Sequence, residues 1–298
     1  MKKLIVIQLI IAIAVLTLSC LQNASQKNAQ SENDIAPGQN LGIASVPNLR
    51  DVGGYATKGG KIVARGVAYR SNQLNPVNAE DMKKIAALGL KNDYDLRTKA
   101  EVAEFPDEIP PGVEYNSLNV FADAKQSSAA MIGKLLQNPK EANEKLGGGK
   151  ADSSFFKGYR DFITLPSAKS AYRKLFLSLS NPSKTPALFH CSTGKDRTGW
   201  AAAALLTLLD VPPNVVMEDY LKSNDYIIPM YRKKIDEFVA AGGDSLIPLT
   251  MFGVKKEYLN ASFDEMQKNY GTIEEYFSEG LGIDTKQQEK IRERFLKN

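Results

Sequence analysis

The chain has 298 residues, 43% of them hydrophobic and 24% charged, and a formal net charge of +4. This composition is that of a globular protein with ample apolar material for a core. The sequence has no run of basic residues and no basic patch interleaved with aromatics. It therefore excludes nucleic acid as a partner, and any attraction for a charged substrate must be local.

The first 20 residues have the pattern of an export signal. Lys2 and Lys3 precede an apolar run from Leu4 to Leu18, which is too short to predict a stable membrane span. The overlapping string Thr17-Leu-Ser-Cys20 resembles a lipobox, in which the cysteine is diacylated after cleavage and becomes the mature N-terminus. The alternatives are an ordinary signal peptide cut nearby and an uncleaved anchor. We expect an exported, membrane-anchored lipoprotein, periplasmic or at the cell surface, that is held by lipid on Cys20 alone.

Residues 21–42 lead from this signal to the globular domain. Gln22 to Asn40 is rich in Asn, Gln, Ser and Ala and contains few apolar residues. A segment of this composition cannot bury enough apolar surface to fold, so it predicts a flexible tether. The domain then spans residues 43–298.

The first part of this domain predicts short strands punctuated by glycines. Strands are expected at 48–50, 61–64, 67–70, 91–97 and 113–120, and a helix at 79–88. Asn78 caps that helix. Thr98 and Glu101 form a capping box for a second, short helix, which favours a structural role for both residues.

Three arginines in this part, Arg50, Arg70 and Arg97, have two interpretations. In one they support a functional site, and in the other they form ion pairs with Asp51 or Glu101. The sequence alone does not separate the two.

The second part of the domain is mostly helical. A helical excursion is expected over 122–149, where Met131, Leu135 and Leu136 give one apolar stripe and three glycines end it. Further helices are expected at 153–163, 167–179, 214–222, 226–241, 255–269, 272–278 and 285–296. A buried strand at 186–190 follows the second of these. Strands first, with helices around and after them, predict one α/β domain with a central sheet flanked by helices.

The segment around this buried strand carries the chemistry. The strand ends at His190, seven residues from Cys191 to Arg197 form a loop, and Thr198 opens an apolar helix. Successive N–H groups of such a loop can form a nest around an oxyanion, and the helix adds free donors and its positive dipole end. We therefore expect a phosphate-binding loop. The residues expected to bind the phosphate are Ser192, Thr193, Gly194, Lys195 and Thr198.

Three side chains of this segment suit nucleophilic attack on phosphorus. The loop donors and Arg197 favour a thiolate at Cys191, so its pKa is expected well below that of a free cysteine. The planar guanidinium of Arg197 can hold two phosphate oxygens and stabilise the charge that develops in the transition state. The hydroxyl of Thr198 can hydrogen-bond the sulfur as it leaves a phosphocysteine intermediate. By chance, His-Cys followed after five residues by Arg-Thr recurs about once in 10⁵ to 10⁶ positions.

The numbers of cysteines and histidines exclude several other kinds of catalytic site. With lipid on Cys20, Cys191 has no disulfide partner inside the chain, so an exported protein would keep one free thiol. His190 is the only histidine, which excludes a Ser-His-Asp triad and a His-rich metal site. It either orients the loop and lowers the Cys191 pKa or simply packs at the strand end. Asp196, rather than Ser or Thr, follows Lys195, so a magnesium-dependent nucleotide loop is not predicted, and no cofactor is expected.

The loop resembles the signature of cysteine-dependent tyrosine and dual-specificity phosphatases. The string from His190 to Gly199 is similar to that of a bacterial and fungal group of secreted phosphatases, which includes mycobacterial and listerial enzymes acting on phosphotyrosine and phosphoinositides. Further landmarks similar to that family, in its order within 43–297, lie at 48–54, 69–71, 95–97, 219–224, 270–271 and Tyr276. The resemblance implies the cysteine-phosphatase fold and metal-free hydrolysis of phosphomonoesters through a phosphocysteine intermediate.

The implied activity is that of a protein-tyrosine or dual-specificity phosphatase with phosphotyrosine proteins as substrates. The alternative is a phosphoinositide or inositol-polyphosphate phosphatase. Lys195 favours this alternative if it projects from the loop rim as a mobile charge, but not if it pairs with Asp196. Three aspartates compete as the general acid, Asp95, Asp123 and Asp196. Asp95 is the first choice because it ends a strand, and Asp196 is expected to brace the loop or position water.

Two other segments can be compared with the family, and the loop disfavours two other functions. Phe105-Pro106-Asp107 resembles the general-acid loop Trp-Pro-Asp of many tyrosine phosphatases, but its Pro-rich surroundings predict a turn. The excursion at 122–149 is shorter than the helical segment that covers the site in the mycobacterial relatives, so the sequence does not predict a complete lid over the site. A rhodanese-like sulfur transferase usually lacks the Arg-Thr ending of the loop. A noncatalytic binding lipoprotein would have lost Cys191 or Arg197.

Overall fold

The computed structural model describes residues 35–124 and 135–297. The predicted export signal, the lipobox with Cys20 and most of the predicted tether lie outside the described residues. Within them, no helix is both long and apolar enough to cross a membrane.

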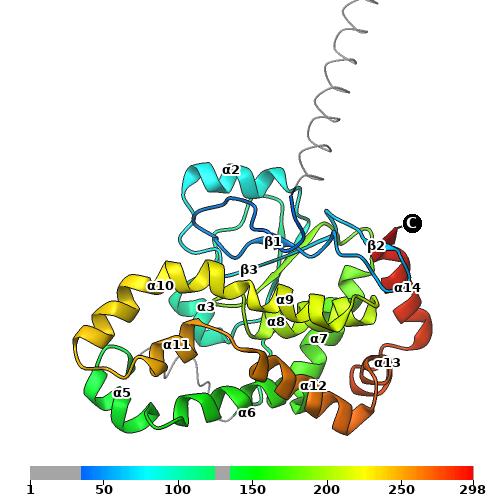
Figure 1. The fold of residues 1–298 in the computed structure, drawn as a ribbon. Helices are drawn as coiled ribbons and strands as arrows, with labels where there is room; N and C mark the ends of the chain where they lie inside the picture. The colour runs from blue at the N-terminus through cyan, green and yellow to red at the C-terminus, as the bar shows by residue number, and fades with distance from the viewer. Residues whose placement is uncertain (1–34, 125–134, 298) are drawn as a thin grey trace, which may run out of the picture.

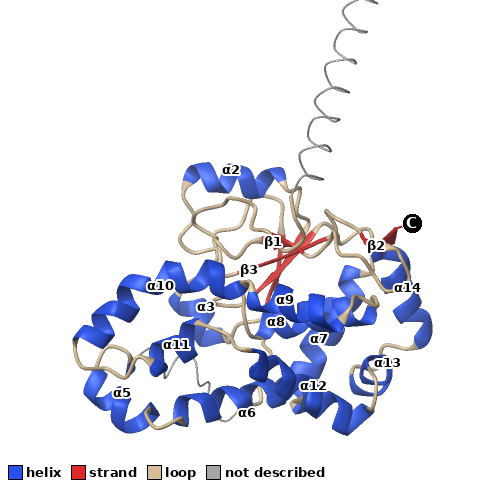
Figure 2. Cartoon of the chain, viewed as in Figure 1, coloured by secondary structure: helices blue, strands red, loops and turns tan. Residues whose placement is uncertain are grey.

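A five-stranded sheet forms the centre of the described part of the chain. Its strand order is β1 (Arg50–Asp51), β3 (Ala68–Ser71), β6 (Ala187–His190), β4 (Asn92–Asp95) and β5 (Glu114–Ser117). The last four strands in this order run parallel to one another, and β1 pairs antiparallel with β3 at one edge. Figure 2 shows the strands of this sheet in red among the helices. The register places Ser71 and Asp95 opposite His190. The carboxyl ends of the inner strands therefore meet at one edge, where α/β folds gather functional groups.

Helices lie on both faces of this sheet (Figure 1). On one face, Leu188 joins an apolar core with α2 (Ala79–Ala87). On the other face, Phe189 joins a larger core with α7 (Pro166–Leu179) and α8 (Arg197–Leu208). Successive side chains of a strand point to opposite faces of the sheet, so the apolar run of β6 fills both cores.

The remaining helices extend the domain beyond the sheet. They are α3 (Lys99–Glu104), α5 (Pro139–Leu146), α6 (Lys150–Thr164), α9 (Pro213–Leu221), α10 (Ser223–Ala240), α11 (Leu246–Phe252), α12 (Lys256–Tyr270), α13 (Ile273–Glu275), the π-helix η1 (Tyr276–Gly280) and α14 (Thr285–Phe295). In Figure 1, α5, α6, α10 and α11 form a helical lobe to one side of the sheet, and α6 packs along α12. A two-stranded ribbon of β2 (Ile62–Val63) and β7 (Leu296–Lys297) joins the C-terminal end to the N-terminal half.

The apolar helix α8 is buried on nearly every side, as its sequence predicts. Trp200, in its first turn, is fully buried and packs edge-on against Phe263 and Tyr276. A helix that is packed on all sides fixes the position of the loop that precedes it.

Most of the expected strands and helices are confirmed with small shifts at their ends, but the helix expected at 272–278 is instead the short α13 followed by the π-helix η1. The structure also adds α11 and β7, which the sequence did not predict. The described part of the expected excursion at 122–149 contains α5, while 125–134 lie outside the description. The expected tether is corrected at its C-terminal end. The carbonyl oxygens of Pro37 and Gly38 accept hydrogen bonds from Lys222 and Tyr226, so the chain packs on the domain already from about this point.

Candidate active site

The phosphate-binding loop predicted from the sequence lies between the end of β6 and the first turn of α8. The helix begins at Arg197, one residue earlier than expected, with Asp196 as its N-cap. Gly194 adopts a positive φ of 69°, and a Cβ there would lie 2.2 Å from the carbonyl oxygen of Ser71, so only glycine fits. The loop thus wraps over the N-terminus of a buried helix, which is an anion-binding arrangement.

Cys191 begins the loop and is only 1% exposed. Burial raises the pKa of its thiol, but the positive charge of Arg197 and hydrogen bonding to Thr198 outweigh burial, so the pKa is lowered. The expected direction of the shift is confirmed. The lowered pKa favours the thiolate, which is the nucleophilic form of cysteine.

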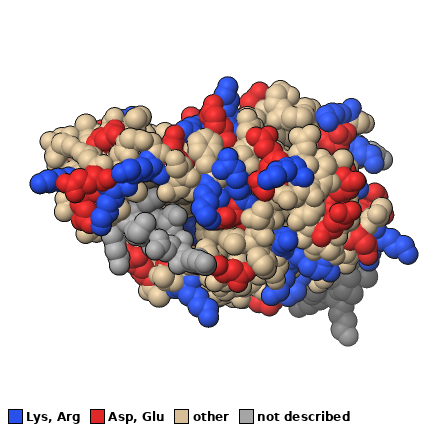
Figure 3. All heavy atoms as spheres, turned by 90° about the horizontal axis from the view of Figure 1, so that it is seen from below, with Lys and Arg blue, Asp and Glu red and all other residues tan. Residues whose placement is uncertain are grey.

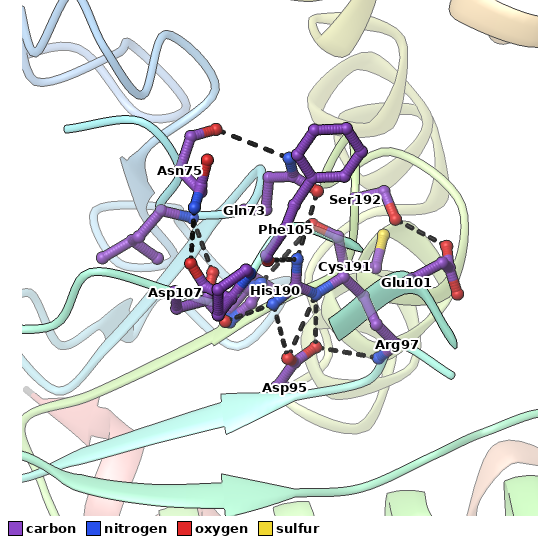
Figure 4. Close-up of polar contacts among 12 residues, drawn as sticks. Gln73, Asn75, Asp95, Arg97, Glu101, Phe105, Asp107, His190, Cys191 and Ser192 are labelled. Atoms are coloured by element: carbon purple, nitrogen blue, oxygen red, sulfur yellow. Dashed lines mark hydrogen bonds and ion pairs between the residues drawn. The ribbon is translucent and has the colours of Figure 1, made fainter. Parts of the chain in front are cut away.

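Arg197 is fixed by Glu101 of α3. Its two terminal nitrogens donate hydrogen bonds of 2.8 Å and 2.7 Å to the two carboxylate oxygens of Glu101. Glu101 also accepts a 2.6 Å hydrogen bond from the hydroxyl of Ser192 in the loop (Figure 4). Burial raises the pKa of Glu101, but the charge of Arg197 outweighs burial and keeps the carboxylate ionised. A bidentate pair of this kind fixes the plane of the guanidinium beside the sulfur.

Glu101 is the functional residue that the sequence interpretation missed. The capping box with Thr98 is confirmed, and it indicated only the start of a helix. The box also holds the Glu101 carboxylate in place, because the N–H and hydroxyl of Thr98 both donate to its Oε2. A structural role and a role in the site therefore coincide in one side chain.

Lys195 and Asp196 form an ion pair in the loop. Lys195 is 1% exposed, and its Nζ lies 3.0 Å from Asp196 Oδ1 and 4.8 Å from the ring centroid of Phe155. The hydroxyl of Tyr159 donates a 2.7 Å hydrogen bond to the same oxygen of Asp196. The expectation of a mobile lysine at the loop rim is therefore wrong, and the alternative, pairing with Asp196, is confirmed in a buried form.

Asp95 ends β4 at the expected edge, but it is fully buried and paired. Its carboxylate accepts hydrogen bonds from Arg97 Nη2, at 2.8 Å, and from the hydroxyl of Tyr115, at 2.9 Å. Burial raises the pKa of Asp95, but its cationic neighbours outweigh burial and lower the pKa to about 2. Asp123 is exposed and accepts a 2.7 Å hydrogen bond from the N–H of Ser167. A carboxylate as strongly ionised as Asp95 has no proton to donate near neutral pH.

His190 lies in a buried cluster with Asp93 and Asp107 beneath the loop. Its Nε2 is 3.2 Å from Asp93 Oδ1 and 3.4 Å from Asp107 Oδ2. Burial lowers the pKa of His190, but Asp93 and Asp95 raise it to about 10. Among the described residues, these three side chains are the group whose ligand atoms, all within 4.8 Å of one another, could hold a metal ion. A protonated imidazole has no lone pair for a metal, so the cluster fits an ion-paired support better than a metal centre.

Arg50 and Arg70 pair with an aspartate that the sequence did not suggest. Both bind Asp219 of α9, each at 2.7 Å, and all three side chains are buried. The expectation that Glu101 serves one of the N-terminal arginines is wrong, because both of its oxygens bind Arg197. The alternative that these arginines form ion pairs is confirmed with a different partner.

The face of the molecule seen in Figure 3 does not share the positive character of the loop. On the face seen in Figure 3, basic and acidic side chains are interspersed over the described residues. Mixed charge creates no wide field that would attract a polyanion. The affinity for an anion must therefore come from the loop itself.

A cysteine of lowered pKa at the start of an anion-binding loop, followed by an arginine fixed at the N-terminus of a helix, is the arrangement of a cysteine-dependent phosphatase. The chain belongs to the tyrosine phosphatase family, whose profile matches residues 41–297. It is similar to a protein of Cupriavidus necator that is provisionally named a tyrosine-protein phosphatase, with 28% identity over 83% of this chain and 86% of the relative.

Further similarities include one protein and one solved structure. One is to the triple specificity protein phosphatase PtpB of Mycobacterium tuberculosis, with 28% identity over 77% of this chain and 89% of that protein. The other is to a solved structure, the core catalytic domain of the PP-IP phosphatase SIW14 from S. cerevisiae. It has 15% identity and a TM-score of 0.29, and the match covers 70% of this chain and 89% of that one.

The pair between Glu101 and Arg197 generates a prediction. Glu101→Gln removes the charge that fixes the guanidinium, so kcat/KM for an aryl phosphate should fall by at least about tenfold. Glu104→Gln, on an exposed position of the same helix, is the matched control and should retain parent activity. Steady-state kinetics measure both, and an unchanged kcat/KM in a folded Glu101→Gln protein would show that Arg197 needs no fixing.

Proposed function

We propose that the protein removes phosphate from phosphotyrosine proteins in two steps, through a phosphocysteine intermediate. The observation that carries the proposal is the buried Cys191, whose pKa Arg197 lowers, together with the ion pair by which Glu101 holds Arg197 in place. In the first step the sulfur attacks phosphorus and the bond to the leaving oxygen breaks, while Arg197 and the loop N–H groups hold the other phosphoryl oxygens. In the second step water attacks phosphorus and the P–S bond breaks. Thr198 hydrogen-bonds the departing sulfur, and inorganic phosphate is released.

We assign the general acid to Asp196 rather than to Asp95. Asp196 lies in the loop next to Arg197, and its side chain is 20% exposed, whereas that of Asp95 is 0% exposed and bound to Arg97. The hydroxyl of Tyr159 orients the Asp196 carboxyl. In its pair with Lys195, Asp196 is a carboxylate, so it accepts a proton from the attacking water in the second step; to donate to the leaving oxygen in the first step it must take up a proton while it is not paired with Lys195.

A second candidate function is the hydrolysis of phosphoinositides or inositol polyphosphates. Lys195 is buried and paired with Asp196, so it is not the mobile rim charge that would favour this function by itself, but it places a second cation in the loop two residues before Arg197. A substrate with another phosphate would replace Asp196 as the partner of this lysine, while phosphotyrosine offers a single phosphate. Similarity to a relative named a triple specificity phosphatase supports this breadth.

We also propose that the mature protein is an exported lipoprotein, anchored to a membrane by lipid on Cys20. The support is the sequence pattern, two lysines followed by the apolar run from Leu4 to Leu18 and then Cys20 after a small serine. The catalytic domain would then work beside a membrane surface, within reach of phosphorylated lipid headgroups as well as proteins.

The nucleophile is tested by Cys191→Ser. Turnover of 4-nitrophenyl phosphate should fall by at least about 10⁴-fold, because a serine hydroxyl in this loop has no base to ionise it. Tungstate binding measured by calorimetry should stay within a few-fold, because the loop N–H groups and Arg197 remain. Parent activity should survive EDTA. Turnover of the variant near the parent rate, or a loss on chelation that zinc or magnesium restores, would contradict the mechanism.

The acid is tested by Asp196→Asn, with Asp123→Asn as the matched control. The loss of kcat should be about 100-fold or more for an alkyl phosphate, whose leaving group needs a proton, and much smaller for 4-nitrophenyl phosphate. The limb of the pH profile that falls at high pH should also disappear. If Asp123→Asn rather than Asp196→Asn shows this leaving-group dependence, the assignment moves to Asp123.

Substrate breadth is tested by Lys195→Ala. Its kcat/KM should fall several-fold more for phosphoinositides or inositol polyphosphates than for a phosphotyrosine peptide, because only the former lose a charge contact. Lys174→Ala, at an exposed position, is the control. Equal losses on both substrates would mean that Lys195 only shapes the loop, and the second candidate function would be dropped.

The anchor is tested by Cys20→Ala in the native host. The parent should fractionate with membranes and carry acyl chains at Cys20, and the variant should be released or misprocessed. Mass spectrometry of the mature N-terminus reads this directly. An unmodified terminus downstream of Cys20 would contradict lipidation.

A further inference from the structure

The outer side of the phosphate-binding loop is held by donors from the N-terminal part of the chain. Three consecutive loop carbonyls each accept one hydrogen bond from outside the loop. They are Ser192 from the N–H of Gln73 (3.3 Å), Thr193 from Nδ2 of Asn48 (3.0 Å) and Gly194 from Nη2 of Arg70 (2.9 Å). Two of the donors are therefore side chains that lie more than 100 residues away along the chain.

These contacts decide where the loop N–H groups point. A trans peptide is planar, so its C=O and its N–H point in opposite directions. The peptide whose carbonyl belongs to Thr193 carries the N–H of Gly194, and the next peptide carries the N–H of Lys195. Holding the two carbonyls outward turns these two N–H groups inward, toward the position of the anion.

Both donors are themselves fixed. Arg70 is 1% exposed, and its Nη1 donates a 2.7 Å hydrogen bond to Asp219 of α9. Asn48 is 0% exposed, and its N–H donates a 3.1 Å hydrogen bond to Asn72 Oδ1. Each side chain therefore reaches the loop from a rigid base rather than from solvent.

We propose that Asn48 and Arg70 are positioning residues, which orient the loop N–H groups for the phosphoryl oxygens by holding the Thr193 and Gly194 carbonyls. The inference rests on the phosphatase activity proposed above. Arg70 acts in a second way as well, because its positive charge and the Cys191 thiolate attract each other. Asn48 is neutral and acts through orientation alone. Comparing substitutions of the two residues therefore distinguishes the effect of loop orientation from the effect of charge.

The test measures anion binding by a chain that cannot turn over. In the Cys191→Ser protein, Asn48→Ala should weaken tungstate binding about tenfold by calorimetry, which corresponds to one well-placed hydrogen bond. Arg70→Lys keeps the charge but loses the fork that joins Asp219 to Gly194, and it should weaken binding by a similar factor. In the active enzyme, both should lower kcat for 4-nitrophenyl phosphate as well as raise KM.

Two matched controls remove the same kinds of contact from carbonyls that do not belong to the loop. Asn224→Ala loses a 2.9 Å hydrogen bond from Nδ2 to the carbonyl of Val254, and Arg173→Lys loses a 2.8 Å bond from Nη1 to the carbonyl of Leu281. They should lower the melting temperature without changing tungstate affinity. If the role of Asn48 were merely structural, Asn48→Ala would likewise lower the melting temperature without changing tungstate affinity.

Tungstate binding by folded Asn48→Ala within twofold of its parent would overturn the inference. If Arg70→Lys does not fold, Asn48→Ala decides alone. Failure of the proposed function looks different, because the unsubstituted chain would then bind tungstate but turn over no phosphomonoester.

Discussion

A negative charge on a buried sulfur is the constraint on which the rest of the site depends. Cys191 is 1% exposed, and burying an ion costs several kcal/mol unless opposite charge and hydrogen bonds offset it. Arg197, the N-terminus of α8 and the loop N–H groups supply that offset. The same groups suit the phosphoryl oxygens, so the stabilisation of the nucleophile and the binding of the substrate are one arrangement.

The residues that stabilise the Cys191 sulfur are themselves charged and buried, so each of them needs an ion-pair partner of its own. Arg197 is buried and is neutralised by Glu101, and Arg70, which holds the loop from outside, is neutralised by Asp219. Removing one member of a buried pair costs about 3–5 kcal/mol, because the other is left uncompensated. This explains why the loop draws its supports from α3, β3 and α9 rather than from its own neighbours in sequence.

The sequence predicted the features that depend on residues close together in the chain. The apolar strand, the loop from Cys191, the buried helix after it and the capping box at Thr98 are all local patterns, and the structure contains each of them. The pairing of Glu101 with Arg197 spans 96 residues, and that of Arg70 with Asp219 spans 149 residues, so no periodicity could indicate either. These pairings depend on strand order, which places distant segments at one edge of the sheet.

Two expectations failed for a related reason. The rule that catalytic groups gather at strand ends placed Asp95 at the correct edge, but it could not show that Arg97 and Tyr115 bind its carboxylate. Lys195 was expected to project from the rim as a mobile charge, whereas it pairs with Asp196 and lies against the ring of Phe155, from α6, in a buried position. In both cases the partner, rather than the position, decides what the side chain can do.

The proposed chemistry depends on the ionisation of Cys191, and this ionisation can be measured directly. In the Cys20→Ala chain Cys191 is the only thiol, so its rate of alkylation by iodoacetamide as a function of pH reports the fraction of thiolate. The rate should rise through a midpoint well below the value of about 8.5 for a free cysteine, and Arg197→Ala should move the midpoint upward. A midpoint at or above that value in the parent would mean that burial outweighs Arg197 and that the loop does not hold a thiolate.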